Sequence, residues 1–404
     1  MPNSSSHTSS NEGPASRGNL DFILILLANA ILGSAMPLLI VLGGLAGLLL
    51  SPTPIFATLP ASAQMLAGLF AAAPMAMMMG KFGRKTGFSF GAVLAALGGL
   101  LGGFSMMTSQ FWLLIIGHML LGAALVCFQY FRFAAGEVVS KKWQPIAISL
   151  TLGSGLIAAF IGPEIFIQTK DFLAPTQFAG AYFAIIVLVA VGIVPLVFTR
   201  FANVETSDNQ SSSTVSIRQV LSRKPVALAV LSAAVSGGIM VYLMTPTPLA
   251  MVGSGFSDTH AGSVIRAHVI AMFAPSFVTG LIIARFGAVN VIMVGMVMLA
   301  VAAGIAMSGI EIHHFYTALI ILGVGWNFAF IGATSLLANS LEPHERTKMQ
   351  GFNDTGVALA FTIASFSSGA IVTSFSWAVT AAVALPILAI MLIGLLLYRK
   401  HLVA

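Results

Sequence analysis

Polar side chains interrupt the apolar stretch of residues 111–142, which is long enough to cross a bilayer at about 1.5 Å per residue. His118 lies in its first half, and Gln129, Tyr130 and Arg132 lie in its second. At about 100° per residue, His118, Gln129 and Arg132 share one face of a helix. An Arg inside a span costs roughly 2.5–3.5 kcal/mol, so we expect it to face a partner or water. This face predicts the wall of a polar cavity, although Arg132 could instead extend to the headgroups.

Comparable side chains lie within apolar stretches of the second half of the chain, namely Tyr242, Thr245, His268, Trp326 and Asn327. Aromatic faces with amide and hydroxyl groups suit a flat heterocycle that forms hydrogen bonds. Together with Gln129, Tyr130 and Arg132 they are the candidate solute-binding residues. Other roles remain open: packing for the aromatic residues, an interhelical hydrogen bond for Asn327, and either titration or hydrogen bonding for His268.

Three ionisable residues are candidates for proton coupling: Glu164, Asp354 and His118. A carboxylate buried near Gly162-Pro163 would take up a proton more readily because desolvation disfavours its charge. The alternative for Glu164 is a solvated position at the membrane surface. Asp354 could instead complete the N-terminus of its helix.

The composition excludes a soluble domain. The chain is 58% hydrophobic and 7% charged, whereas about a quarter of the residues of a soluble domain are charged. The net charge of +6 therefore reflects membrane orientation and not nucleic-acid binding. The single cysteine, Cys127, cannot form an intramolecular disulfide, and a packing role is favoured over a nucleophile or metal ligand.

Apolar stretches predict an all-α polytopic fold of about twelve spans of roughly 20 residues each. Fifteen of the 18 Lys and Arg residues lie in loops on one predicted side, leaving Arg132, Lys170 and Arg266 elsewhere. The positive-inside rule places that side, and both termini, in the cytoplasm. Tyr182 and Trp377 open predicted spans on the other side and are expected to be interface anchors. Gly98, Gly99, Gly102 and Gly103 predict close helix approach.

The longest polar segment divides the apolar stretches six and six. The predicted organisation is a disordered tail (1–19), a six-helix bundle (20–200), a linker (201–224), a second bundle (225–398) and a tail (399–404). Lys81-Phe82-Gly83 is echoed by Arg285-Phe286-Gly287, which supports an internal repeat. Two six-span halves with a site between them are the architecture of many secondary transporters.

Several motifs resemble the major facilitator superfamily, over about residues 21–398. The loop Gly80-Lys81-Phe82-Gly83-Arg84-Lys85 resembles the family signature after the second span, with Gly80 where the family usually has an acidic residue. The fourth-span signature has His118 where the family usually has Arg. Further stretches resemble a bacterial branch that includes riboflavin uptake transporters: Thr245–Met251, His268–Phe277, Gly325–Phe328 and Gln350–Asp354.

The resemblance implies a monomeric transporter in the bacterial inner membrane that moves a flavin-like solute, with protons as a candidate coupling ion. The alternative is a proton-coupled efflux antiporter of drugs or metabolites. An enzyme is disfavoured: residues 87–91 match G-x-S-x-G but open a predicted span and not a strand-to-helix elbow. No cofactor or metal motif is predicted, and no pore-loop repeat favours a channel.

Overall fold

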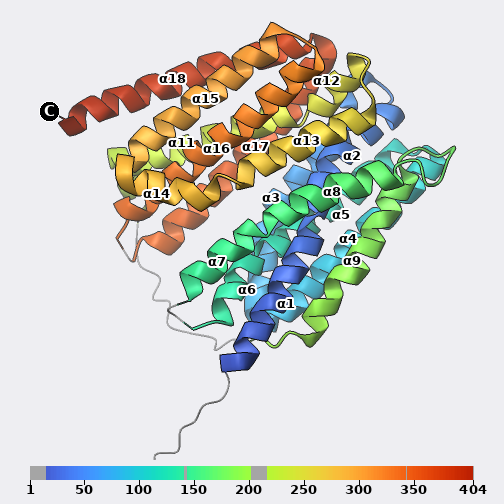
Figure 1. Ribbon diagram of the computed structural model, residues 1–404, viewed down its shortest axis with the longest axis horizontal. Helices are drawn as coiled ribbons and strands as arrows, with labels where there is room; N and C mark the ends of the chain where they lie inside the picture. The colour runs from blue at the N-terminus through green and yellow to red at the C-terminus, as the bar shows by residue number, and fades with distance from the viewer. Residues whose placement is uncertain (1–14, 141–142, 202–215, 343, 404) are drawn as a thin grey trace, which may run out of the picture.

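The computed structural model describes residues 15–140, 143–201, 216–342 and 344–403, and everything below refers to these residues. They form eighteen α-helices and one 3-10 helix, with no strand among them. Figure 1 shows two groups of helices, one before and one after residues 202–215. This confirms the predicted all-α fold, whereas the domain boundaries remain predictions.

The first group holds six apolar segments, several of them broken into two helices. Its helices are α1 (Ala15–Gly33), α2 (Ala35–Leu50), η1 (Pro54–Phe56), α3 (Leu59–Phe82), α4 (Arg84–Thr108), α5 (Phe111–Gln129), α6 (Phe131–Glu137), α7 (Gln144–Gly153), α8 (Gly155–Thr169) and α9 (Ala179–Phe198). The short helix α10 (Ile217–Leu221) precedes the second group.

The second group repeats this pattern with longer unbroken helices towards its end. Its helices are α11 (Lys224–Met244), α12 (Thr247–Gly253), α13 (Asp258–Phe273), α14 (Ser276–Phe286), α15 (Ala288–Ser308), α16 (Ile312–Ser340), α17 (Arg346–Ser374) and α18 (Trp377–Val403). We call the two groups the N-half and the C-half.

Ten described segments are long and apolar enough to cross a membrane, and the pair α13–α14, bent by 42°, makes an eleventh. The remaining predicted span corresponds to α7 and α8. It is broken at Ser154, and α8 alone is an apolar helix shorter than a full span. The prediction of about twelve spans therefore differs from this count because helix breaks divide some of them.

Close helix approach at the predicted glycines is confirmed in the N-half. A Cβ at Gly98 would lie 2.8 Å from the carbonyl oxygen of Gly117, and one at Gly102 would lie 2.3 Å from the Tyr182 ring. Only glycine lets these backbones pack so closely. Gly83 and Gly287 end their helices with φ of 88° and 82°, so the predicted sequence repeat has the same backbone geometry in both halves.

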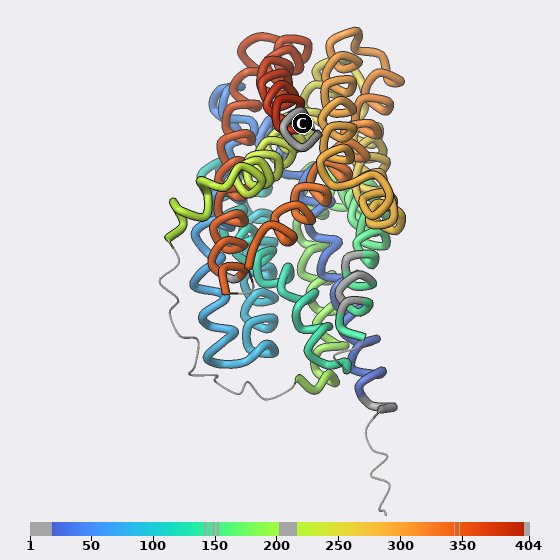
Figure 2. Tube along the Cα trace, turned by 90° about the vertical axis from the view of Figure 1, so that its left-hand side faces the viewer, coloured from blue at the N-terminus to red at the C-terminus, as the bar shows by residue number. Residues whose placement is uncertain are grey.

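The two halves approach each other at one end of the molecule, the closed end, which carries the loops at 51–58, 170–178, 254–257 and 375–376. They diverge towards the other end, the open end, where α1 begins and α18 finishes (Figures 1 and 2). All hydrogen bonds and ion pairs that join described residues of the two halves lie between mid-depth and the closed end, namely Ser62–Ser365, Glu164–Arg266, Lys170–Asp258 and Gln177–Asp258.

An Arg–Glu ion pair holds the open end of each half. Arg84 contacts Glu137 at 2.6 Å in the N-half, and Arg223 contacts Glu345 at 2.5 Å in the C-half. Arg84 is the first residue of α4, directly after Gly83 in the turn that follows α3, and Glu137 ends α6. The loop is thus clamped to a neighbouring span by a charge pair even though Gly80 replaces the usual acidic residue.

Candidate functional site

His118 lies in a hydrogen-bonded cluster inside the N-half. Its Nδ1 lies 2.9 Å from Gln64 Oε1, its Nε2 lies 2.7 Å from the Tyr182 hydroxyl, and all three side chains are buried. A Cβ at Gly43 would lie 2.8 Å from the imidazole, so the ring is also closely packed. The cluster joins α3, α5 and α9, and satisfying both ring nitrogens in this way favours a packing role.

Tyr182 is not an interface anchor, contrary to the prediction, because it is fully buried and bonded to His118. Trp377 is also buried, with its ring centroid 5.6 Å from that of Phe315. Sequence reasoning missed Gln64 and Tyr182 as partners of His118. Gly102, against which the Tyr182 ring packs, was the available signal that a large side chain lies between these helices.

Gln129, Tyr130 and Arg132 lie where α5 gives way to α6. Gln129 is exposed, and the Tyr130 hydroxyl lies 3.4 Å from the carbonyl oxygen of Ala72. Arg132 stacks on Phe133, with its guanidinium carbon 4.8 Å from the ring centroid. Its Nε is buried and has no hydrogen-bond partner among the described residues. The structure therefore brings these three residues together towards the open end of the N-half.

In the C-half, His268 lies at the seam between α13 and α16. It is fully buried, and its Nδ1 lies 2.7 Å from the carbonyl oxygen of Leu319. Its Nε2 is buried and lacks a partner within the described part of the chain. A buried imidazole nitrogen without a hydrogen bond costs roughly 1–3 kcal/mol, so this atom is expected to meet water or a solute.

Asn327 holds the break between α13 and α14. Its Nδ2 donates to the Met272 carbonyl oxygen and to Ser276 Oγ, both at 2.7 Å, and its Oδ1 accepts from Thr279 Oγ1 at 2.6 Å. Pro275 cannot supply a backbone N–H, so the helix is interrupted here. The interhelical hydrogen bond considered as an alternative role for Asn327 is therefore present.

Trp326 precedes Asn327 on α16. Its ring centroid lies 6.5 Å from that of Phe273, edge-on, and 5.1 Å from that of Phe330, on which it stacks. Its Nε1 is buried and has no partner in the described ranges. The same is true of the Tyr242 hydroxyl on α11. Thr245 is buried at the break between α11 and α12, beside Gly44 of α2. The C-half thus contains aromatic rings and buried polar atoms without partners among the described residues.

The two candidate carboxylates, Glu164 and Asp354, have different settings. Glu164 on α8 is 48% exposed, so the expected burial is wrong, and its carboxylate accepts from Arg266 on α13 at 2.6 Å and from Gln168 at 2.8 Å. It takes part in a link between the halves. Arg266 was not among the predicted functional residues. Asp354 is exposed on α17, and its charge is within electrostatic reach of Tyr130 in the other half.

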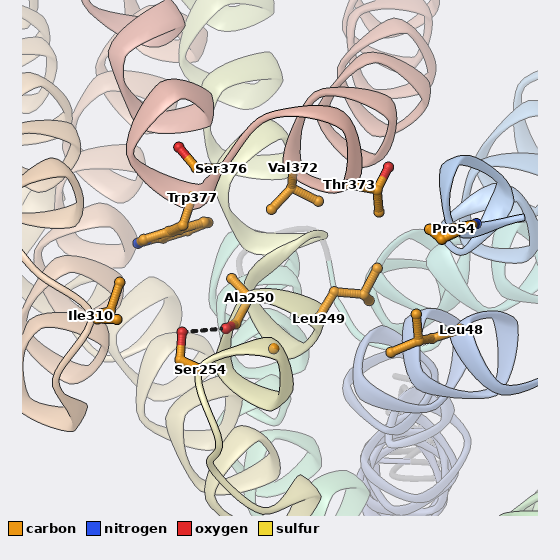
Figure 3. A pocket seen from close by; sticks show the side chains of 11 residues that line it. Leu48, Pro54, Leu249, Ala250, Ser254, Ile310, Val372, Thr373, Ser376 and Trp377 are labelled. Atoms are coloured by element: carbon orange, nitrogen blue, oxygen red, sulfur yellow. Dashed lines mark hydrogen bonds between the residues drawn. The ribbon is translucent and has the colours of Figure 1, made fainter.

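A further cavity of about 360 Å³ lies at the closed end, between the halves (Figure 3). Leu48 and Pro54 of the N-half line one side, and Leu249, Ile310 and Trp377 of the C-half line the other. Its lining is mainly apolar. None of the candidate solute-binding residues lines it, so it is a separate cavity.

These features agree with comparisons to known proteins. A family model for the Major Facilitator Superfamily matches residues 247–402. The riboflavin transporter RfnT of Brucella anthropi is 35% identical over 96% of this chain and 98% of its own length. This chain belongs to the major facilitator superfamily.

Another relative in the superfamily is the uncharacterized transporter YddS of Bacillus subtilis, 28% identical over 77% of this chain and 76% of its own. Among solved structures, nucleoside transporter NupG aligns with a TM-score of 0.74 at 11% identity, covering 93% of this chain and 99% of that one. The Escherichia coli fucose:proton symporter FucP gives 0.59 at 16% identity, with 94% and 98% covered. The chain is therefore a multi-pass membrane transporter with this superfamily's fold.

Proposed function

We propose that this protein takes up riboflavin, or a closely related flavin, across the bacterial inner membrane. The observation that carries the proposal is the likeness to RfnT, a riboflavin transporter, at 35% identity over nearly the whole of both chains. The site is compatible with it. A flavin has a flat aromatic ring system and an edge of carbonyl oxygens and ring nitrogens, which requires aromatic surfaces and hydrogen-bond donors.

Two unpaired groups in the C-half supply such donors, the Tyr242 hydroxyl and Trp326 Nε1. His268 Nε2 supplies an acceptor instead, because Nδ1 of the neutral ring donates to the Leu319 carbonyl oxygen. We place Arg132 on the same route from the N-half because its Nε is buried without a partner, with Gln129 and Tyr130 beside it. Thr245 and Asn327 support the C-half side. The solute enters between the halves from the open end in the conformation described here. By the positive-inside rule this end faces the cytoplasm, so the conformation is the inward-facing one.

The direct test is uptake of labelled riboflavin by a bacterial riboflavin auxotroph that expresses this chain. We expect rescue of growth at low riboflavin and saturable uptake that unlabelled riboflavin competes away. An efflux antiporter would instead lower the sensitivity of the cells to lipophilic cations without rescuing growth. The control is the same chain carrying Arg132→Ala, which should reach the membrane and fail to take up the vitamin.

We assign proton coupling first to Glu164. Its bond to Arg266 at 2.6 Å joins α8 to α13 near the closed end, so a proton on the carboxyl group would weaken a contact that holds this end shut. Asp354 is the second candidate because it is exposed towards Tyr130 across the open end. His118 is third, since both of its nitrogens already have partners.

Glu164→Gln removes the charge and retains the shape of the side chain. We expect it to abolish accumulation driven by a pH gradient, while exchange of labelled for unlabelled solute continues. Glu137→Gln is the matched control, because it removes a carboxylate from an Arg–Glu pair within one half. Unchanged accumulation with unchanged pH dependence in Glu164→Gln would reject the assignment.

A further inference from the structure

Three side chains that can ligate a metal converge at the closed end, where α16 begins after α15. They are Glu311, His313 and His314, and one ligand atom from each lies within 4.8 Å of the other two. Nδ1 of His313 lies 3.3 Å from Oε2 of Glu311, and the two imidazole centroids are 4.1 Å apart. The cluster lies away from the solute-binding residues proposed above.

His314 is held in place within this cluster. A Cβ at Gly309 would lie 2.4 Å from Cε1 of the His314 ring, so the absence of a side chain there makes room for the imidazole. Nδ1 of this ring is buried and has no hydrogen-bond partner in the part of the chain that the structure describes. A buried imidazole nitrogen without a hydrogen bond costs free energy, so binding of a ligand to this ring is favoured.

Glu311 and His313 are the two ligands of this cluster whose side chains are free to change position. Their side chains are 74% and 65% exposed, so both can rotate without disturbing packing. Ligand atoms around a tetrahedral zinc ion, with bonds of about 2.0–2.2 Å, lie roughly 3.3–3.6 Å apart. The Glu311–His313 distance already matches this spacing, and rotation of exposed side chains can shorten the longer separations.

The ligand set decides which ions fit. Two imidazoles and one carboxylate favour zinc, copper or nickel, whereas magnesium and calcium prefer oxygen ligands. The positive end of the α16 dipole disfavours a cation by about 0.3–1 kcal/mol. The Glu311 carboxylate, which lies at that helix end, opposes this repulsion.

We propose that Glu311, His313 and His314 form a binding site for a divalent transition-metal ion of the zinc class. The ion would fix the turn between α15 and α16. Ile310 in this turn forms part of the wall of the closed-end cavity (Figure 3). Phe315, one turn of α16 later, packs against Trp377. The site is thus attached to the packed closed end of the C-half.

Isothermal titration calorimetry with zinc tests the site, using the full chain purified in detergent without a polyhistidine tag. We expect saturable binding of one zinc ion per chain, with magnesium giving no competition. His313→Ala and His314→Ala should each weaken binding by at least about tenfold, since even the loss of groups that support metal ligands costs 10–100-fold. Glu311→Gln keeps an oxygen atom but loses the charge and should weaken binding less than either histidine variant.

The matched control is His260→Ala, which removes another exposed histidine near the closed end, one that bonds to Ser257 at 2.8 Å. It should bind zinc as the unaltered chain does. Absorption of bound cobalt provides a second readout, because its visible bands depend on the ligands and should change in His314→Ala. The proposal fails if the unaltered chain shows no saturable zinc binding. It also fails if the His313→Ala, His314→Ala double variant binds zinc as tightly as His260→Ala.

Discussion

The two halves use their buried polar groups differently. In the N-half, both nitrogens of His118 have partners, and the cluster with Gln64 and Tyr182 is closed. In the C-half, His268 has one bonded nitrogen and one without a partner in the described chain, and the Tyr242 hydroxyl is likewise unpaired. Buried polar atoms without partners are rare in folded proteins. Their concentration in the C-half is the reason for proposing that this half provides most of the contacts to the solute.

Both halves contain an Asn side chain that forms hydrogen bonds at a break in a neighbouring helix, and we call each of these a latch. Asn29 on α1 donates to the Thr151 carbonyl oxygen at 3.0 Å and to Ser154 Oγ at 2.7 Å, at the break between α7 and α8. Asn327 on α16 makes the corresponding pair of bonds at the α13–α14 break and accepts a third. Asn327 is fully buried and Asn29 is half-buried. The C-half latch should therefore be the stiffer of the two.

The largest effect on stability is expected from His118→Ala. It leaves Gln64 and the Tyr182 hydroxyl buried without their partner, at about 1–3 kcal/mol for each group. His268→Ala removes one hydrogen bond to the Leu319 carbonyl oxygen, which keeps its bond within α16, and removes an atom that had no partner. Thermal unfolding in detergent should thus show a markedly lower Tm for His118→Ala than for His268→Ala. An equal or larger decrease in Tm for His268→Ala would contradict the proposed difference between the halves.

The next effect concerns the two latches. Asn327→Ala removes three buried hydrogen bonds and should cost roughly 1–3 kcal/mol, whereas Asn29→Ala removes two half-buried bonds and should cost about 0.5–1.5 kcal/mol. The measurement is again Tm in detergent, with solute transport recorded for the same variants. The latch interpretation predicts that Ser276→Ala, which retains the bond to Met272, falls between Asn327→Ala and the unaltered chain.

A smaller effect is expected at Tyr242, and it distinguishes a role in solute binding from a role in packing. Tyr242→Phe removes a hydroxyl without a protein partner, so it should leave Tm unchanged or raise it, and should weaken riboflavin binding by roughly two- to tenfold, equivalent to about 0.5–1.5 kcal/mol. Tyr182→Phe removes the partner of His118 and should lower Tm with little direct effect on Kd. Quenching of riboflavin fluorescence measures the binding. If both variants lower Tm and neither changes Kd, Tyr242 is a packing residue.

The all-α fold was predictable because hydropathy alone identifies most spans, whereas the orientation derived from charge asymmetry remains a prediction. The glycines at 98–103 also predicted their close contacts. The roles of individual polar residues were less accessible. The spacing that placed His118 on the same face as Arg132 does not reveal that Gln64 and Tyr182, from two other spans, satisfy both of its nitrogens. Arg266 lies nearly opposite His268 on α13, so a site built around His268 leaves it out, and the sequence gives no sign that Glu164 of α8 is its partner.

The smallest predicted effect is a pH dependence at the open end of the C-half. The bond from the Arg223 guanidinium, at 2.5 Å, and the backbone N–H of Glu342 hold the pKa of the Glu345 carboxyl below its usual value of 4.5. A lowered pKa in the folded state means that the ionised pair stabilises the protein above the unfolded-state pKa. This contribution is lost as the pH falls through the folded-state pKa.

Acidification below about pH 4.5 should therefore lower Tm more in the unaltered chain than in Glu345→Gln. Glu342→Gln is the control, because it leaves the Arg223–Glu345 pair in place and should keep the full acid sensitivity. Equal acid sensitivity in all three proteins would mean that groups other than Glu345 cause the loss of stability.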